Sequence, residues 1–205
     1  MKELNIHPKN PQYRLIEQAV LALKTGSILI YPTSCAYVLG CRLGDHEAAE
    51  RLRIIRQVDK SHFFTLMCRN LSEIATYAIV DNWAFRLLKA HTPGDYTFVL
   101  RATQAVPKRM MHDKRKTVGL RIPSNPIAQT LLEALNEPIL STTLIMPGET
   151  LPLSDPYEIQ DRLSHQVDLF INAGPGSLEA TTVVDLSKEK PELIREGKGD
   201  TSIWL

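Results

Sequence analysis

Two short hydroxyl-rich segments follow predicted strands in this sequence. The first (residues 32–36, PTSCA) comes after the apolar run 27–31, and the second (residues 141–143, STT) ends a later apolar run. Loops at the ends of strands are where α/β proteins commonly bind ligands, and hydroxyls beside free backbone N–H groups suit a phosphate or a carboxylate. Alternatively, these hydroxyls serve only the local turns, through hydrogen bonds to the backbone.

Arginines recur in a predicted helix over roughly residues 45–56. Arg53 and Arg56 are neighbours at i, i+3 spacing, and Lys60 follows beyond the predicted helix end. A guanidinium group can bind phosphate through two parallel hydrogen bonds, so this face could hold a phosphate. The alternative is a solvated helix face whose arginines pair with acidic neighbours on the same helix.

Cationic side chains gather in the middle of the chain, although its net charge is only +1. Residues 101–121 carry a local charge of +6, whereas residues 149–205 carry −6. The densest part comprises Lys108, Arg109, Lys114, Arg115 and Lys116. A phosphate backbone relieves the repulsion in such a run through counterion release. Few aromatic residues interrupt the run, so it favours contact with double-stranded RNA over base stacking, and a solvated basic loop is the alternative.

Several classes of site are excluded by the sequence. The three cysteines form no CxxC pair and the six histidines have no HExxH spacing, so we expect neither a disulfide framework nor protein-bound zinc. Walker and GxGxxG phosphate-binding motifs are absent from the sequence. The N-terminal residues lack the apolar core of a signal peptide, and no apolar run approaches about 18 residues. We therefore expect a reduced, cytoplasmic protein with no membrane contact.

Predicted helices and strands alternate along all 205 residues. Helix starts are expected at Asn10-Pro11, Asp45, Asp81, Asn125-Pro126 and Asp155-Pro156. Strands are expected at 27–31, 63–67, 96–100, 117–122, 139–143, 169–171 and 182–186. This alternation predicts one α/β (or α+β) domain over residues 1–205, with a twisted, mixed β-sheet and flanking helices.

Five segments, taken in order, resemble motifs of the YrdC/YciO family. YPTSCAYVLG, from residue 31, resembles that family's YPTDTxYGLG, and TVGLRIP, from residue 117, resembles its xVxxRxP strand. STTLIMPG, from residue 141, resembles STSANxSG. ATTVVD, from residue 180, and IREG, from residue 194, resemble STVVD and LRxG. The resemblance runs from about residue 11 to residue 199, and segments such as RIIRQ and HFFTLM look most similar to the YciO branch.

The resemblance implies a twisted YrdC-like domain with a basic concave face. YrdC members make threonylcarbamoyl-adenylate from ATP, L-threonine and bicarbonate for tRNA modification, which supports translation. The family is also associated with binding of double-stranded RNA. If this chain is similar in function, ATP would be its substrate and Mg²⁺ would accompany the phosphates.

The family's functional positions carry over incompletely. Its KxR motif falls on residues 54–56 (IIR), its SxN motif on residues 143–145 (TLI), and the second threonine of its opening motif on Cys35. The positions that match are Thr33, Arg121, Thr181 and Arg195. The isoleucines remove a cation and an amide from the implied phosphate-binding wall, which favours a YciO-like binding protein over a full synthase. A nearby cation, Lys60 or Arg53, is an alternative replacement for the missing lysine.

Two main hypotheses follow from these residues. In the first, the basic face binds RNA (double-stranded RNA or tRNA) or a nucleotide phosphate. Nucleotide or phosphate binding is assigned to Thr33, Arg56, Lys60, Arg121, Ser141, Thr143, Thr181 and Arg195, and RNA binding to Arg53, Lys108, Arg109, Lys114, Arg115 and Lys116. In the second, the chain is a threonylcarbamoyl-AMP synthase that holds the triphosphate of ATP. A pocket for a different small anion stays open as a third reading, and the sequence does not indicate an oligomeric state.

Overall fold

The computed structural model describes residues 1–59, 62, 64–112 and 114–204. Within this part of the chain, ten strands form one mixed sheet in the order β1–β8–β2–β3–β7–β4–β6–β5–β9–β10. The strands are β1 (Lys2–Asn5), β2 (Leu29–Tyr31), β3 (Val38–Arg42), β4 (Thr65–Met67), β5 (Tyr96–Arg101), β6 (Thr117–Arg121), β7 (Ile139–Thr143), β8 (Leu169–Asn172), β9 (Thr182–Asp185) and β10 (Glu192–Arg195). The sheet contains parallel pairs such as β4–β6 and β5–β9 and antiparallel pairs such as β3–β7 and β5–β6, which confirms the predicted mixed α/β sheet.

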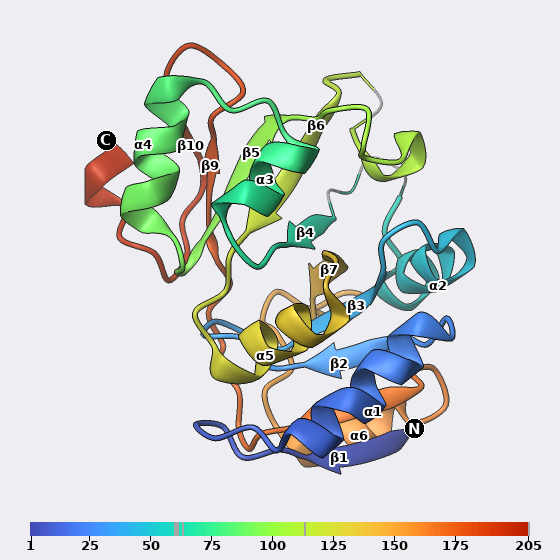
Figure 1. The fold of residues 1–205 in the computed structure, drawn as a ribbon. Helices are drawn as coiled ribbons and strands as arrows, with labels where there is room; N and C mark the ends of the chain where they lie inside the picture. The colour runs from blue at the N-terminus through green and yellow to red at the C-terminus, as the bar shows by residue number, and fades with distance from the viewer. Residues whose placement is uncertain (60–61, 63, 113, 205) are drawn as a thin grey trace.

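Helices cover both faces of the sheet. They are α1 (Tyr13–Lys24), α2 (His46–Arg56), α3 (Leu71–Tyr77), α4 (Asn82–His91), α5 (Pro126–Leu135) and α6 (Pro156–Leu163). Successive strand residues point to opposite faces, so Leu66 belongs to the core cluster that includes residues of α2, α3, α4 and α6, whereas its neighbour Met67 belongs to the cluster that includes residues of α1 and α5. In Figure 1, α1 and α6 lie beside the β1–β2 end of the sheet, and α3 and α4 lie beside β5, β6, β9 and β10.

Three of the predicted helix starts are confirmed by side-chain caps. Asp45 accepts a hydrogen bond from Ala48 N at 3.0 Å, and the side chains of Asn125 and Asp155 cap α5 and α6 in the same way, each before a proline. These oxygens satisfy backbone N–H groups that have no partner inside the helix. Helices α2, α5 and α6 therefore begin where the sequence indicated.

The other two start signals are only partly correct. The expected cap at Asn10-Pro11 is wrong, because α1 begins at Tyr13, after a turn in which the His7 ring accepts hydrogen bonds from two backbone N–H groups. The expected start at Asp81 is confirmed, because Asp81 is the N-cap residue of α4, but its side chain makes no cap hydrogen bond. Its carboxylate lies 3.4 Å from the guanidinium of Arg101, so an ion pair replaces the cap.

Four elements were not predicted from the sequence. Strands β1 and β10 form the two edges of the sheet, where one side of the strand is unpaired and the sequence is largely polar. Helix α3 has only seven residues, and β3 follows directly on the segment interpreted as a loop. Among the described residues no helix is long and apolar enough to cross a membrane.

Candidate anion-binding site

A pocket of about 400 Å³ lies on one face of the sheet. Helices α1 and α5 cover the same face at the other end of the sheet. Its floor crosses four strands, because Thr65 pairs with Gly119, Gly119 with Val99, and Val99 with Asp185. Side chains alternate along each strand, so the next residues on this face are Met67, Arg121, Thr97 and Val183, which also line the pocket. The regular register of the sheet therefore places residues from distant parts of the chain in one hollow.

Four arginines from separate positions along the chain line this pocket. Arg56 ends α2, Arg115 precedes β6, Arg121 ends β6 and Arg195 ends β10. The sequence assigned three of these to phosphate binding and Arg115 to RNA binding. Their convergence on one pocket makes the local potential strongly positive, although the whole chain carries only +1.

Arg56 has an uncompensated charge. Its Nε is buried and donates no hydrogen bond, and no carboxylate within the described chain pairs with its guanidinium. Burial lowers its pKa below the ordinary arginine value. An unpaired cation in partly buried surroundings is costly to the free protein, and a bound anion would relieve that cost.

Arg195 is held in place by Thr181, which directly precedes β9. Its Nη2 donates to the carbonyl oxygen of Thr181 at 2.8 Å and to the Thr181 hydroxyl at 3.2 Å. Burial lowers its pKa, and no carboxylate of the described residues forms an ion pair with it. Thr181 therefore orients Arg195 without neutralising it.

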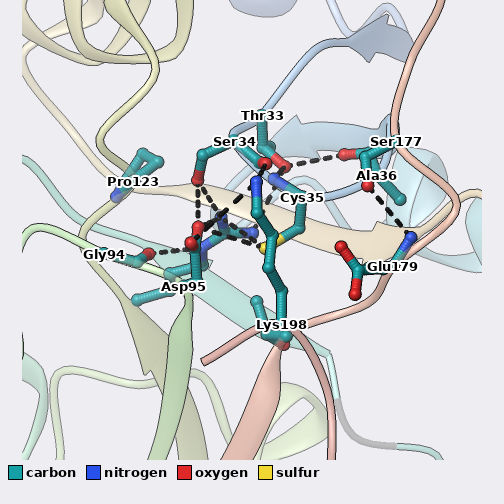
Figure 2. Close-up of polar contacts among 12 residues, drawn as sticks. Thr33, Ser34, Cys35, Ala36, Gly94, Asp95, Pro123, Ser177, Glu179 and Lys198 are labelled. Carbon is teal, nitrogen blue, oxygen red and sulfur yellow. Dashed lines mark hydrogen bonds and ion pairs between the residues drawn. The ribbon is translucent and has the colours of Figure 1, made fainter. Parts of the chain in front are cut away.

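Arg121 differs because its guanidinium is already enclosed by polar partners. It is 2% exposed, and it donates to Ser34 Oγ at 3.0 Å and to Thr33 Oγ1 at 3.4 Å. The Asp95 carboxylate lies 3.9 Å away and accepts a hydrogen bond from Ser34 at 2.5 Å (Figure 2). Thr33 thus holds Arg121 from behind and does not itself line the pocket.

Asp95 connects this cluster to the C-terminal segment. Lys198 lies 4.0 Å from its carboxylate and donates to the carbonyl oxygen of Ser34, as Figure 2 shows. Burial acts to raise the pKa of Asp95, but hydrogen bonds from Ser34 and Cys35, with the charges of Lys198 and Arg121, lower it overall. Asp95 therefore compensates Arg121 and leaves Arg56 and Arg195 as the less neutralised cations.

The predicted hydroxyls occupy two kinds of position. Ser141, Thr143 and Thr181 line the pocket, where they offer neutral hydrogen bonds beside the arginines. Ser141 Oγ is 2.6 Å from the Tyr31 hydroxyl, which fixes its rotamer. The second hydroxyl segment thus faces the pocket, whereas the first supports it from behind.

The predicted RNA-binding cations lie mainly outside the pocket lining. Lys108 and Arg109 lie in a short 3-10 helix (Lys108–Met110), and they are exposed, as are Lys114 and Lys116. Arg53 packs over the ring of Phe64 at 4.6 Å and donates to a backbone carbonyl at 2.9 Å. Lys60 lies outside the described residues.

The two isoleucines that depart from the family pattern differ in placement. Ile145 lines the pocket, whereas Ile54 is 66% exposed on α2 and does not. Cys35 lies behind the pocket, with its sulfur 3.4 Å from Arg121, and burial raises the pKa of its thiol to about 11. In the described part of the chain no group of three or more His, Cys, Asp or Glu side chains could hold a metal ion.

His62 lines the pocket but was not singled out from the sequence, where a lone histidine carries no signal. Its Nε2 lies 3.1 Å from the Thr142 hydroxyl. Burial, together with the charges of Arg56, Arg53 and Arg195 and against the charge of Asp59, lowers its pKa from 6.5 to about 4. That several arginines act on one imidazole shows how closely their charges converge.

Replacing His62 with glutamine is expected to reduce the loss of stability in mild acid. The His62 imidazole binds a proton more tightly in the unfolded chain than in the folded protein. Its contribution to the free energy of unfolding is therefore fully present above about pH 6.5 and is lost as the pH falls toward 4. Allowing for solvent screening, we expect the wild type to lose about 1–2 kcal/mol more than the variant between pH 7 and pH 4. Urea titrations across this range measure the difference.

The control for this prediction is His165→Gln, at an exposed histidine outside the pocket lining. It should follow the wild-type profile. Parallel stability profiles for the wild type and His62→Gln would contradict the assignment.

Comparisons with known proteins agree with this fold. A family model named Sua5_yciO_yrdC and described as "Telomere recombination" matches residues 21–197. The chain is 55% identical over 200 residues to the uncharacterized protein YciO of Escherichia coli K12, covering 98% of this chain and 97% of that protein. The crystal structure of E. coli YciO superposes with a TM-score of 0.97 over 100% of both chains, at 54% identity.

A more distant relative carries a named activity. The threonylcarbamoyl-AMP synthase of Vibrio vulnificus is 26% identical over 185 residues, covering 89% of this chain and 98% of the synthase. The family match, the near-complete coverage and the shared architecture give one conclusion. This chain belongs to the Sua5/YciO/YrdC family and is similar to YciO over almost its whole length.

Proposed function

We propose that the pocket binds a nucleotide, with its phosphates against Arg56 and Arg195. The observation that carries this proposal is that two arginines, Arg56 half-buried and Arg195 more exposed, line one cavity without a carboxylate partner among the described residues. Guanidinium groups bind phosphate oxygens in pairs, and desolvation strengthens that attraction. Arg121 adds positive charge from a fixed position, and the Thr143 hydroxyl in the lining supplies a further hydrogen-bonding group.

The pocket's size and composition support a small ligand over a duplex. Its volume of about 400 Å³ suits a single small molecule. Apolar side chains occupy much of the remaining lining, namely Val38, Val99, Ile145, Val183 and Ile194. Such a surface suits the base or sugar of a nucleotide better than a free inorganic anion.

Calorimetric titration of the full chain with ATP, AMP and adenosine tests this proposal. We expect ATP and AMP to bind and adenosine, which has no phosphate, to bind much more weakly. Affinity should fall as salt is raised, because the contact is ionic. Equal binding of AMP and adenosine, or no binding of either phosphate, would refute the proposal.

We also propose that RNA binds the surface around the pocket. Arg115 lines the pocket, and exposed cations flank it in sequence: Lys108, Arg109, Lys114 and Lys116. A polyanion that places one phosphate in the pocket could thus contact these residues outside it. Each phosphate neutralised adds close to one unit of negative slope to log K against log salt on double-stranded nucleic acid.

A filter-binding series with double-stranded RNA at several salt concentrations measures this contact. The double variant Lys114→Gln/Lys116→Gln should weaken binding and make the slope less negative by about 2. The matched control Lys188→Gln/Lys190→Gln removes two charges from the acidic C-terminal part of the chain and should leave the slope unchanged. Absence of binding at low salt, or equal slopes for all three proteins, argues against RNA as a partner.

A threonylcarbamoyl-AMP synthase is the second candidate function. It is favoured by the similarity to proteins of that name and by a pocket that gathers Arg56, Arg121 and Arg195 for a triphosphate. Ile145 weakens it, because an aliphatic side chain there offers neither a donor nor an acceptor. Asp185 is the only acidic side chain that lines the pocket in the described part of the chain, so Mg²⁺ would enter on the nucleotide's phosphates. Pyrophosphate release that requires both threonine and bicarbonate would support this activity, and release independent of threonine would exclude it.

A further inference from the structure

The imidazole of His62 is held at the pocket wall by two contacts. His62 lies between α2 and β4 along the chain and lines the pocket. Its Nε2 is 3.1 Å from the hydroxyl of Thr142 on β7, and its ring meets the Phe64 ring edge-on, with the centroids 5.6 Å apart. In the described part of the chain no residue forms a hydrogen bond with Nδ1. The ring is therefore fixed in position, and one of its nitrogens is available to a ligand.

Positive charge outweighs negative charge around this ring. Arg53 and Arg56, from the last turn of α2, and Arg195, from β10, all oppose a proton on the imidazole. Of the charges that act on the ring, only that of Asp59 favours a proton. The protein without ligand thus disfavours one more cation at this position.

The rest of the described lining has the same imbalance. Arg115 and Arg121 add positive charge, and Asp185 is the single carboxylate among the described lining residues. Burial acts in the same direction as the arginines, and together they lower the pKa of His62 to about 4. Near pH 7 the ring is therefore neutral, so only one of its two nitrogens carries a hydrogen.

Phosphate groups bound in the pocket would reverse this balance. They would neutralise the guanidinium groups of Arg56 and Arg195 and bring negative charge to the ring. An opposite charge favours the protonated imidazole, so the pKa of His62 would rise on binding. Both ring nitrogens would then donate, Nε2 to the Thr142 hydroxyl and Nδ1 to a phosphate oxygen.

Resting on the proposed nucleotide function, we infer that His62 is a further anion-binding residue of this pocket, which takes up a proton when phosphate groups bind. The ligand itself creates the cation that contacts it, because the arginines prevent that cation from forming beforehand. The residue makes the affinity of the pocket depend on pH, which the arginines by themselves do not, since they stay charged across the physiological range.

The direction of the pH effect follows from proton linkage. A group that holds its proton more tightly in the complex than in the free protein makes binding take up a proton. Affinity therefore rises as the pH falls, until His62 is also protonated in the free protein, near pH 4.

Calorimetric titration with ATP, for the wild type and for His62→Gln, tests this inference. Titrations at pH 5.5 in two buffers of different ionisation enthalpy count the protons taken up. The wild type should take up about half a proton more than the variant. The ratio of wild-type to variant affinity should rise about tenfold between pH 7.5 and pH 5. Protonation of ATP itself affects both proteins equally and cancels in this ratio.

His165→Gln is the matched control, because His165 is exposed and does not line the pocket. It should take up as many protons as the wild type and show the same pH dependence. A second variant, His62→Asn, should behave like His62→Gln. Urea unfolding of each protein at both ends of the pH range shows that the fold is intact.

Two results separate this inference from the function on which it depends. If ATP binds the wild type but proton uptake equals that of His62→Gln and the ratio of affinities does not change with pH, the role of His62 is wrong and nucleotide binding stands. If ATP does not bind the wild type at any pH in this range, both the proposed function and this inference are overturned.

Discussion

Replacing Arg56 with methionine is expected to stabilise the free protein while weakening nucleotide binding about 10- to 100-fold. The affinity loss corresponds to hydrogen bonds between a guanidinium and a charged phosphate, each worth about 1.5–3 kcal/mol. Titration with ATP and urea unfolding of the same preparation measure the two effects together.

The stability gain has a specific cause. The Nε of Arg56 is buried without a hydrogen-bond partner, which costs about 1–3 kcal/mol for such a donor. Arg56 also ends α2, where a cation gains about 0.3–1 kcal/mol from the helix dipole. The first effect is larger, so methionine, a good helix former, should raise the free energy of unfolding by about 0.5–1 kcal/mol.

Arg86→Met is the matched control, since Arg86 is exposed on α4 and does not line the pocket. It should change neither affinity nor stability by a measurable amount. A destabilised Arg56→Met protein with unchanged ATP affinity would show that Arg56 is structural and would contradict the proposed site.

Replacing Gly197 with alanine should cost about 2–4 kcal/mol and disturb the arginine end of the pocket. A Cβ at this position would lie 2.4 Å from the carbonyl carbon of Thr181 and 2.5 Å from the oxygens of Ala180 and Thr181. These are backbone atoms, so the clash cannot be relieved by a side-chain rotation. The segment that holds Gly197 must move away from the segment that holds Ala180 and Thr181. The expected fall in melting temperature is about 5–10 °C.

The same clash reaches the pocket because several contacts hold these segments together. Lys198 N donates to the Ala180 carbonyl at 2.9 Å, and Arg195 donates to the Thr181 carbonyl at 2.8 Å. Separation would release Arg195 from the orientation that Thr181 gives it, so ATP affinity should fall together with stability.

Glu196→Ala is the control, because it changes an exposed side chain next to Gly197 without adding bulk against Thr181. It should unfold at the wild-type temperature. A Gly197→Ala protein with wild-type melting temperature and ATP affinity would show that neither the fold nor the pocket depends on the close approach of Gly197 to Thr181.

The fold class could be predicted because it depends on local patterns. Apolar runs with turn residues between them gave most central strands, and Asp45, Asn125 and Asp155 marked helix starts by capping chemistry that acts within three residues. The edge strands β1 and β10 could not be predicted in this way. They become strands by pairing with β8 and β9, which is a tertiary contact and leaves no apolar run in the sequence.

For the site, the sequence by itself determined which residue types were available: arginines at 56, 121 and 195, and hydroxyls at 141, 143 and 181. Only the tertiary structure decided how their charges are distributed. It brought Asp95 and Thr33 against Arg121, left Arg56 and Arg195 without carboxylates in the described chain, and added His62 and Asp185 to the lining. The physical reason is that sheet register and burial set the partners of a charge. These depend on strands far apart along the chain, whereas residue type is fixed at each position.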